Sequence, residues 1–312
     1  MNAIQLADLH KLYGSVKALD GLDLEVPLGS VFGFLGPNGA GKTTTLRILA
    51  GLAKANSGTI VINGKSVQPF TANLEIGYLP EDPAFYPWMT PIETLNYFGG
   101  VFGLKSSECK TRGNELLQMV GLKDVAKRRV GGFSRGMRQR LGLAQALINR
   151  PTILLLDEPV SALDPIGRKE VLELIESLRH ECTILMSTHI LEDAERVCDT
   201  LAILYQGRRL LQSDREALME QYAAPLLDLE LSNGQTKELD TIAEQLKKTT
   251  GIIDVKRNGN VLRLSVRDIK TAQTEVLKEI LAHGWHFERL DVAKPSLEEI
   301  FVKLVGIEGS IQ

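Results

Sequence analysis

The chain has 312 residues, of which 44% are hydrophobic and 24% charged, and its formal net charge is −3. This composition is typical of a globular protein of about two domains, the small net charge gives no reason to expect nucleic-acid binding, and no apolar run approaches the roughly 18 residues of a membrane helix. Because the three cysteines are scattered and the N-terminus lacks a signal peptide, we expect a reduced, cytoplasmic protein.

Two segments near the N-terminus, residues 3–8 and 20–26, alternate apolar and polar side chains and predict short strands. Tyr13 lies between them, upstream of a glycine-rich stretch. Its ring could stack on a purine base, or it could be a half-buried residue at a strand end. Tyr13 by itself does not distinguish between these two roles.

The strongest pattern is residues 36–44, which read GPNGAGKTT and satisfy the phosphate-binding pattern G-x-x-x-x-G-K-[ST]. An apolar run precedes it and a helical segment follows, which is the context that the motif requires. Glycines let successive backbone N–H groups turn toward phosphate oxygens, and the helix N-terminus adds partial positive charge. Lys42 can then reach the β- and γ-phosphates, and the Thr43 hydroxyl can bind Mg²⁺. The predicted nucleotide-binding residues of this loop are Gly36, Asn38, Gly39, Gly41, Lys42, Thr43 and Thr44.

Residues 80–90 contain three prolines, which exclude a regular helix or a central strand. The same segment carries four large apolar side chains, those of Phe85, Tyr86, Trp88 and Met89. These side chains either fold back onto the core or form a surface for a partner, because aromatic residues and Met are enriched at interfaces.

Residues 91–150 predict a helical region, since apolar side chains recur there at three- and four-residue steps. In its middle, residues 131–140 predict a loop that leads into a helix. Ser134 and backbone N–H groups would lie in the first turn of that helix. This helix start is a second candidate anion site.

Residues 153–156 form a continuous apolar run, typical of a buried parallel strand, and Asp157 and Glu158 follow it directly. Ligands of open α/β sheets bind at this end of the strands. Beside a phosphate-binding loop, Asp157 can hold Mg²⁺ and Glu158 can act as a general base toward water; the alternative is a plain charged strand end. A further buried strand leads to His189, which is placed where a γ-phosphate would lie.

The pattern changes after a predicted connecting helix at 213–225. The following segments predict the order β-α-β-β-α-β, with Asn258 and Gly259 as a hairpin turn. This order is that of a ferredoxin-like unit. We therefore expect two domains, at 1–220 and 221–312, with a helical subdomain at about 90–150.

Taken together, the motifs of roughly residues 1–220 resemble those of the nucleotide-binding subunits of ABC transporters. The implied fold is α/β: a P-loop NTPase core with a helical subdomain and an antiparallel β subdomain, followed here by a small α+β, ferredoxin-like C-terminal domain. The resemblance rests on Walker A at 36–43, the signature at 133–137, Walker B at 153–158, the D-loop at 161–164, the switch histidine His189 and the adenine-stacking Tyr13.

The resemblance implies an ATPase that uses ATP and Mg²⁺, with Glu158 and His189 as catalytic residues. In this family each ATP lies between the phosphate-binding loop of one subunit and the signature of a second, here Ser134 and Gly136. A homodimer would thus close on ATP and open after hydrolysis. The implied partner is a separate integral membrane permease, which places the chain on the inner face of the cell membrane. The alternative is a non-transport relative that acts on nucleic acid or ribosomes.

Two positions depart from the family pattern. The signature reads FSRGM rather than LSGGQ, a form similar to that of an exporter branch. Glu81 replaces the Q-loop glutamine; its carboxylate can still bind Mg²⁺ but adds a charge. The resemblance also favours the docking of residues 82–89 on the membrane partner over folding onto the core.

Overall fold

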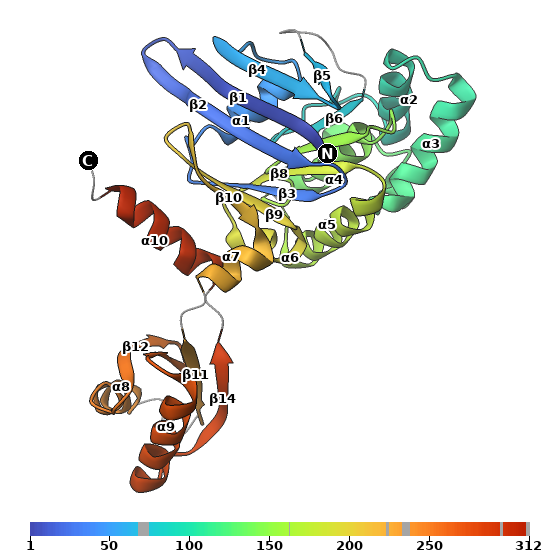
Figure 1. Ribbon diagram of the computed structural model, residues 1–312. Coiled ribbons are helices and arrows are strands. Elements are labelled where there is room, and N and C mark those ends of the chain that lie inside the picture. The colour runs from blue at the N-terminus through green and yellow to red at the C-terminus, as the bar shows by residue number, and fades with distance from the viewer. Residues whose placement is uncertain (68–74, 162, 223–224, 233–237, 294–295, 310–312) are drawn as a thin grey trace. The chain divides into compact units, whose positions relative to one another are not determined.

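The computed structural model describes residues 1–312 except 68–74, 162, 223–224, 233–237, 294–295 and 310–312. Ala162, within the expected D-loop, therefore lies outside the described residues. The internal contacts divide the chain into two compact units, Met1–Arg215 and Glu216–Gln312. Figure 1 labels most of the elements of both units, and each unit is described by itself.

The first unit contains a six-stranded sheet in the order β10-β9-β3-β8-β7-β6. All neighbours in it pair in parallel except β10, which is antiparallel to β9. The continuous apolar sequences of β3 and β7 are explained by burial of every residue in both strands. The strands are β3 (Val31–Leu35), β6 (Ile76–Leu79), β7 (Ile153–Asp157), β8 (Thr183–Thr188), β9 (Thr200–Tyr205) and β10 (Arg208–Asp214).

A second, antiparallel sheet of the first unit has the order β2-β1-β4-β5. Its first two strands extend well beyond the expected segments, because β-bulges near Leu9 and Leu12 shift the pairing and interrupt the alternation of apolar and polar residues. The hairpin turns at Gly14, whose φ is +59°. The strands are β1 (Asn2–Tyr13), β2 (Val16–Pro27), β4 (Ser57–Ile62) and β5 (Lys65–Ser66).

Helix α1 (Lys42–Leu49) packs between these two sheets, and its Leu46 lies in one buried cluster with Leu24 of β2 and Phe34 of β3. Helices α5 (Pro165–Ser177) and α6 (Leu191–Val197) contact each other, and α6 also contacts β3 and β8. This layering buries the strands and leaves their carboxyl ends open near the start of α1.

The expected helical region consists of α2 (Pro91–Val101), α3 (Ser106–Met119) and α4 (Arg135–Ala146). Thr90 caps α2 through a reciprocal pair of hydrogen bonds with Glu93, and Ser134 caps α4. Short 3-10 turns lie at Lys123–Val125, Val130–Gly132 and Leu178–His180. Among the described residues, no helix has the length and hydropathy required to span a bilayer.

The second unit contains an antiparallel sheet in the order β12-β13-β11-β14. From β11 to β14 its elements follow the order β-α-β-β-α-β, so the ferredoxin-like order expected from the sequence is present. Its elements are α7 (Arg215–Gln221), β11 (Leu226–Leu231), α8 (Leu239–Leu246), β12 (Ile252–Asn258), β13 (Val261–Val266), α9 (Ile269–His283), β14 (Phe287–Ala293) and α10 (Leu297–Gly309). One face of the sheet buries leucines of β11 and β13 against α8 and α9.

Candidate functional site

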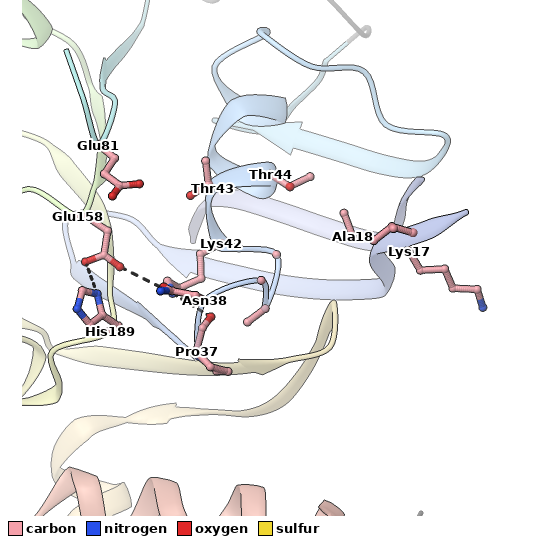
Figure 2. Close-up of a pocket in the computed structure, with 14 residues that line it drawn as sticks. Lys17, Ala18, Pro37, Asn38, Lys42, Thr43, Thr44, Glu81, Glu158 and His189 are labelled. Carbon is pink, nitrogen blue, oxygen red and sulfur yellow. Dashed lines mark hydrogen bonds and ion pairs between the residues drawn. The ribbon is translucent and has the colours of Figure 1, made fainter. Parts of the chain in front are cut away.

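A pocket lies where the loop between β3 and α1 meets the carboxyl ends of β6 and β7. This is the edge at which ligands bind in open α/β sheets. Figure 2 shows that Glu158 and His189 approach Lys42 of the loop, whereas the side chain of Lys17 extends away from them. The lining residues are Val16, Lys17, Ala18, Pro37, Asn38, Gly39, Ala40, Gly41, Lys42, Thr43, Thr44, Glu81, Glu158 and His189.

The glycine loop has a conformation that other residues would not tolerate. Gly41, at the N-cap of α1, has a φ of +107°, and a Cβ there would lie 2.7 Å from the carbonyl oxygen of Ala18. A Cβ on Gly36 would lie 2.5 Å from the carbonyl oxygen of Leu204. The loop therefore keeps its backbone close to β2 and β9, and α1 starts with N–H groups suited to an anion.

Lys42 is nearly buried, with 6% of the side chain exposed. Its Nζ donates to the carbonyl oxygens of Gly36, at 2.7 Å, and Pro37, at 3.3 Å, and lies 3.8 Å from Oε1 of Glu158. Burial lowers the pKa of Lys42, and the Glu158, Asp157 and Glu81 carboxylates oppose this shift. A desolvated ammonium at the loop is well placed to meet phosphate oxygens.

Glu158 lies between Lys42 and His189, as Figure 2 shows. Its Oε2 is 2.9 Å from Nδ1 of His189. Its backbone has a φ of +49°, which is uncommon for a residue other than glycine. The surrounding bonds hold this conformation: the Glu158 N–H donates to Oγ of Ser187 at 3.1 Å, and Nε2 of Gln139 donates to the Glu158 carbonyl at 3.5 Å.

Asp157 ends β7 and is buried. Its Oδ1 accepts hydrogen bonds from Thr43 Oγ1 at 3.1 Å and from Ser187 Oγ at 2.6 Å. Burial raises the pKa of this carboxyl, and the bonds from Ser187 and Thr43 partly offset the effect. Its Oδ2 is buried without a hydrogen-bond partner among the described residues.

This oxygen set fits Mg²⁺. The ion prefers hard oxygen donors, and it is usually held by one or two carboxylates while phosphates and water complete its shell. The Thr43 hydroxyl and the Asp157 carboxylate are adjacent, and the free Oδ2 of Asp157 leaves donor capacity for a cation. Glu81 lines the same pocket at the end of β6.

The structure also identifies two residues that sequence reasoning missed, Ser187 and Gln139. Ser187 holds both Asp157 and the backbone of Glu158. Its position, at the end of the strand beside β7, could have indicated this role. Gln139 gives no such signal, because its contact with Glu158 depends on how α4 packs.

Tyr13, Ser134 and Gly136 are not among the residues that line this pocket within one copy of the chain. Tyr13 ends β1 and is 48% exposed, with Lys11 Nζ lying 4.6 Å from its ring centre. Ser134 caps α4, accepting a hydrogen bond from the Met137 N–H at 3.2 Å. An accessible helix start of this kind is suited to an anion brought by another molecule.

Two of the three aromatic residues in the segment after β6 lie on the surface, whereas Phe85 is half-buried. Tyr86 is 44% exposed and Trp88 is 61% exposed, and their ring centroids are 5.0 Å apart. Tyr86 also contacts Tyr97 of α2 edge to face, at 6.0 Å. The cluster Tyr86, Trp88 and Tyr97 is therefore available to a partner, and folding of Tyr86 and Trp88 onto the core is excluded.

Comparisons with known proteins agree with this geometry. Residues 19–161 match the family model described as ABC transporter, and residues 214–305 match that of the ATP-binding protein DrrA1-3-like C-terminal domain. The chain is 38% identical to the uncharacterized ABC transporter ATP-binding protein YxlF of Bacillus subtilis, over 97% of this chain and 99% of the relative. It is 37% identical to the bacitracin transport ATP-binding protein BcrA of Bacillus licheniformis, over 97% of each chain.

Solved structures give the same result for the first unit. An ATP-binding subunit of an ABC transporter superposes with a TM-score of 0.64 and 31% identity, over 70% of this chain and 93% of its own. A dimeric bacterial ABC transporter cassette superposes with a TM-score of 0.63 and 25% identity, over 68% of this chain and 98% of its own.

Proposed function

The chain belongs to the ATP-binding subunits of ABC transporters, and from this premise we propose that it hydrolyses ATP in a site shared between two copies and thereby drives an exporter. The observation that carries the proposal is the position of the Glu158 carboxylate, 3.8 Å from Lys42 Nζ and 2.9 Å from His189 Nδ1, at the edge of a phosphate-binding loop.

Within one copy, each residue has a distinct role. The loop backbone and Lys42 bind the β- and γ-phosphates, and Tyr13 stacks on the adenine. Thr43 and Asp157 would hold Mg²⁺, with Glu81 contributing through its carboxylate, and the bound ion would neutralise phosphate charge. Glu158 accepts a proton from the attacking water, and His189 holds the Glu158 carboxylate and contacts the γ-phosphate.

A second copy completes the site. Ser134 and Gly136 lie at the accessible start of α4 and do not line the pocket of their own chain. We assign them to the ATP bound by the partner copy, where the helix start meets the γ-phosphate. A dimer of solved cassettes provides the precedent for two such chains in one assembly. ATP would then hold the dimer closed, and hydrolysis would release it.

The membrane partner is a separate permease. The described part of this chain has no membrane-spanning helix, so transport requires an integral subunit. The exposed cluster Tyr86, Trp88 and Tyr97 is the surface that we assign to it, since aromatic side chains are enriched where proteins bind one another. This contact places the chain on the inner face of the cell membrane. The exporter-like signature FSRGM supports outward transport.

Affinity purification from detergent-solubilised membranes tests the proposal. The tagged full chain is expected to co-purify with one integral membrane protein, and the complex is expected to hydrolyse ATP. Recovery of the chain alone, or with ribosomes, would contradict the transport role. The comparisons give no support to the alternative of a nucleic-acid-directed ATPase.

A further inference from the structure

One margin of the C-terminal sheet is formed by β14. Among the described residues β14 pairs only with β11, so the backbone groups of its other side face outward. The unpaired backbone groups of an edge strand can pair with another strand unless charged residues, a bulge or a covering segment prevents it. The described part of the second unit places no strand against this edge.

The side chains beside this edge are apolar and uncovered. Phe287 and Val292 of β14 are 40% and 52% exposed, and Leu277 and Leu281 of α9 are 40% and 82% exposed. Leu277 and Phe287 line the same surface hollow, together with Leu290. Phe287, Leu290 and Val292 pair with Leu231, Leu229 and Leu227, so they lie on the face of the sheet that carries the buried core. The apolar core of the unit therefore continues to an open margin.

The opposite margin, β12, likewise pairs with only one strand among the described residues, β13, but its side chains differ from those of β14. Its Val255 is only 6% exposed, within the cluster that contains residues of α8. Arg257 of β12 forms an ion pair with Asp240 of α8 at 2.9 Å. A register shift next to Ile253 interrupts the strand, a feature that discourages edge pairing. The two margins thus differ in their side chains: β12 exposes one large apolar residue, Ile253 at 63%, beside the register shift, whereas β14 and α9 together expose a strip of four.

The charges of β14 are arranged to match a second copy of the same strand. Arg289 and Asp291 flank Leu290 and are 58% and 55% exposed. Within one chain Arg289 Nε lies 3.2 Å from Asp291 Oδ2 and 3.3 Å from Glu230 Oε2. If two β14 strands pair antiparallel around Leu290, each Arg289 lies opposite an Asp291 of the other copy. The reason is that the residue numbers of opposite residues in an antiparallel pair add to the same total. Two reciprocal ion pairs then form, and Leu290 faces Leu290 on the apolar side.

From these features we propose that the C-terminal units of two copies associate through β14, joining their sheets antiparallel across a two-fold axis at Leu290. This contact is distinct from the shared ATP site and requires no nucleotide. It keeps two copies together when the ATP-binding units open, which raises their effective concentration for the next closure. The inference adds a second dimer contact to the proposed function.

Cysteine cross-linking of the full chain without nucleotide tests the register. Leu290→Cys should form a covalent dimer under mild oxidation, because facing Cβ atoms across an antiparallel pair lie about 5 Å apart. Val292→Cys is the matched control, since its two copies would be offset by about 13 Å along the strands. Cross-linking of Leu290→Cys no faster than that of Val292→Cys would overturn the proposal.

Charge reversal provides a second measurement that does not depend on Leu290. Asp291→Arg should raise the dissociation constant of the dimer, measured without nucleotide, about tenfold. The substitution places Arg opposite Arg at two sites. Adding Arg289→Asp should restore dimerisation, and Lys256→Asp on β12 should leave it unchanged. An equal dissociation constant for Asp291→Arg and the unaltered chain, in sedimentation experiments, would contradict the proposal. ATP-dependent closure of the Asp291→Arg chain reports separately on the shared ATP site.

Discussion

The Nδ1 atom of His189 lies 2.9 Å from Oε2 of Glu158, while Oε1 of the same carboxylate lies 3.8 Å from Nζ of Lys42. The carboxylate is thus held from both sides, by an imidazole and by a buried ammonium. The backbone of Glu158 is fixed by Ser187, at the end of the neighbouring strand. A carboxylate restrained in this way at a phosphate-binding loop is positioned to accept a proton from water.

Glu158→Gln should bind ATP and dimerise but hydrolyse ATP about 10²–10⁴-fold more slowly, because the amide removes the base without changing its shape. Phosphate release under single-turnover conditions measures the chemical step. Nucleotide binding, measured in parallel, separates this step from affinity. Unchanged turnover would remove Glu158 from the catalytic role.

His189→Ala should slow hydrolysis by about 10²-fold, far more than it weakens ATP binding, since the imidazole orients Glu158 through the bond at 2.9 Å in addition to its contact with the γ-phosphate. His180 provides a control because it lies in the 3-10 turn Leu178–His180, away from the residues that line the pocket. His180→Ala should retain full activity. Equal effects of the two substitutions would argue against a specific role for His189.

Lys42→Ala should weaken ATP binding by roughly tenfold to a hundredfold, which corresponds to the loss of charge-assisted hydrogen bonds worth about 1.5–3 kcal/mol. Lys17 lines the same pocket, but its side chain is 65% exposed. Lys17→Ala should therefore have a much smaller effect, because solvent screens its charge. Isothermal titration with ATP compares the two variants, and an unaltered affinity of Lys42→Ala would refute the assignment of the loop.

Trp88→Ala combined with Tyr86→Ala should uncouple transport and reduce recovery of the membrane partner, because both rings are exposed. Basal ATP hydrolysis by the isolated chain should stay unchanged. Leu28→Ala is a matched control, since Leu28 is 55% exposed elsewhere on the first unit. Loss of hydrolysis in the isolated double variant would indicate a structural role for the aromatic pair.

Burial raises the pKa of the Cys182 thiol from its ordinary 9.0 to about 11. A raised pKa means that the folded state favours the neutral thiol. The contribution of this thiol to the unfolding free energy is therefore present below pH 9 and is lost as the pH rises toward 11. Between pH 8 and pH 11, the unaltered chain should lose about 2 kcal/mol more unfolding free energy than Cys182→Ala. Urea unfolding measures the difference, and identical pH dependence of both proteins would contradict it.

Much of the fold is predictable because its signals are local. The continuous apolar runs of β3 and β7, the caps Thr90 and Ser134 and the hairpin at Gly259 each reflect short-range chemistry. The full length of β1 and β2 was not predictable in the same way. Bulges break their alternation, and the pairing that sustains both strands joins residues far apart in the sequence.

The residues of the site also differ in whether local sequence signals predict them. Lys42, Thr43, Asp157, Glu158 and His189 follow motifs with fixed spacing, and the structure brings them together. The role of Ser187 depends on the pairing of β8 with β7, and that of Gln139 on how α4 packs next to β6. Neither role belongs to a sequence motif. The opposite charges of Arg289 and Asp291 likewise suggest pairing between two copies only once β14 is known to be an edge strand.

The most direct test of the shared site is the ATPase activity of two inactive variants before and after mixing. In Lys42→Ala the phosphate-binding loop is defective, and in Ser134→Glu the signature is blocked by charge. If each ATP lies between two copies, a mixed dimer contains one site with an intact loop from one copy and an intact Ser134 from the other. An equimolar mixture, equilibrated before ATP is added, should therefore hydrolyse ATP well above the average of the separate variants. Activity equal to that average would contradict a site shared between two chains.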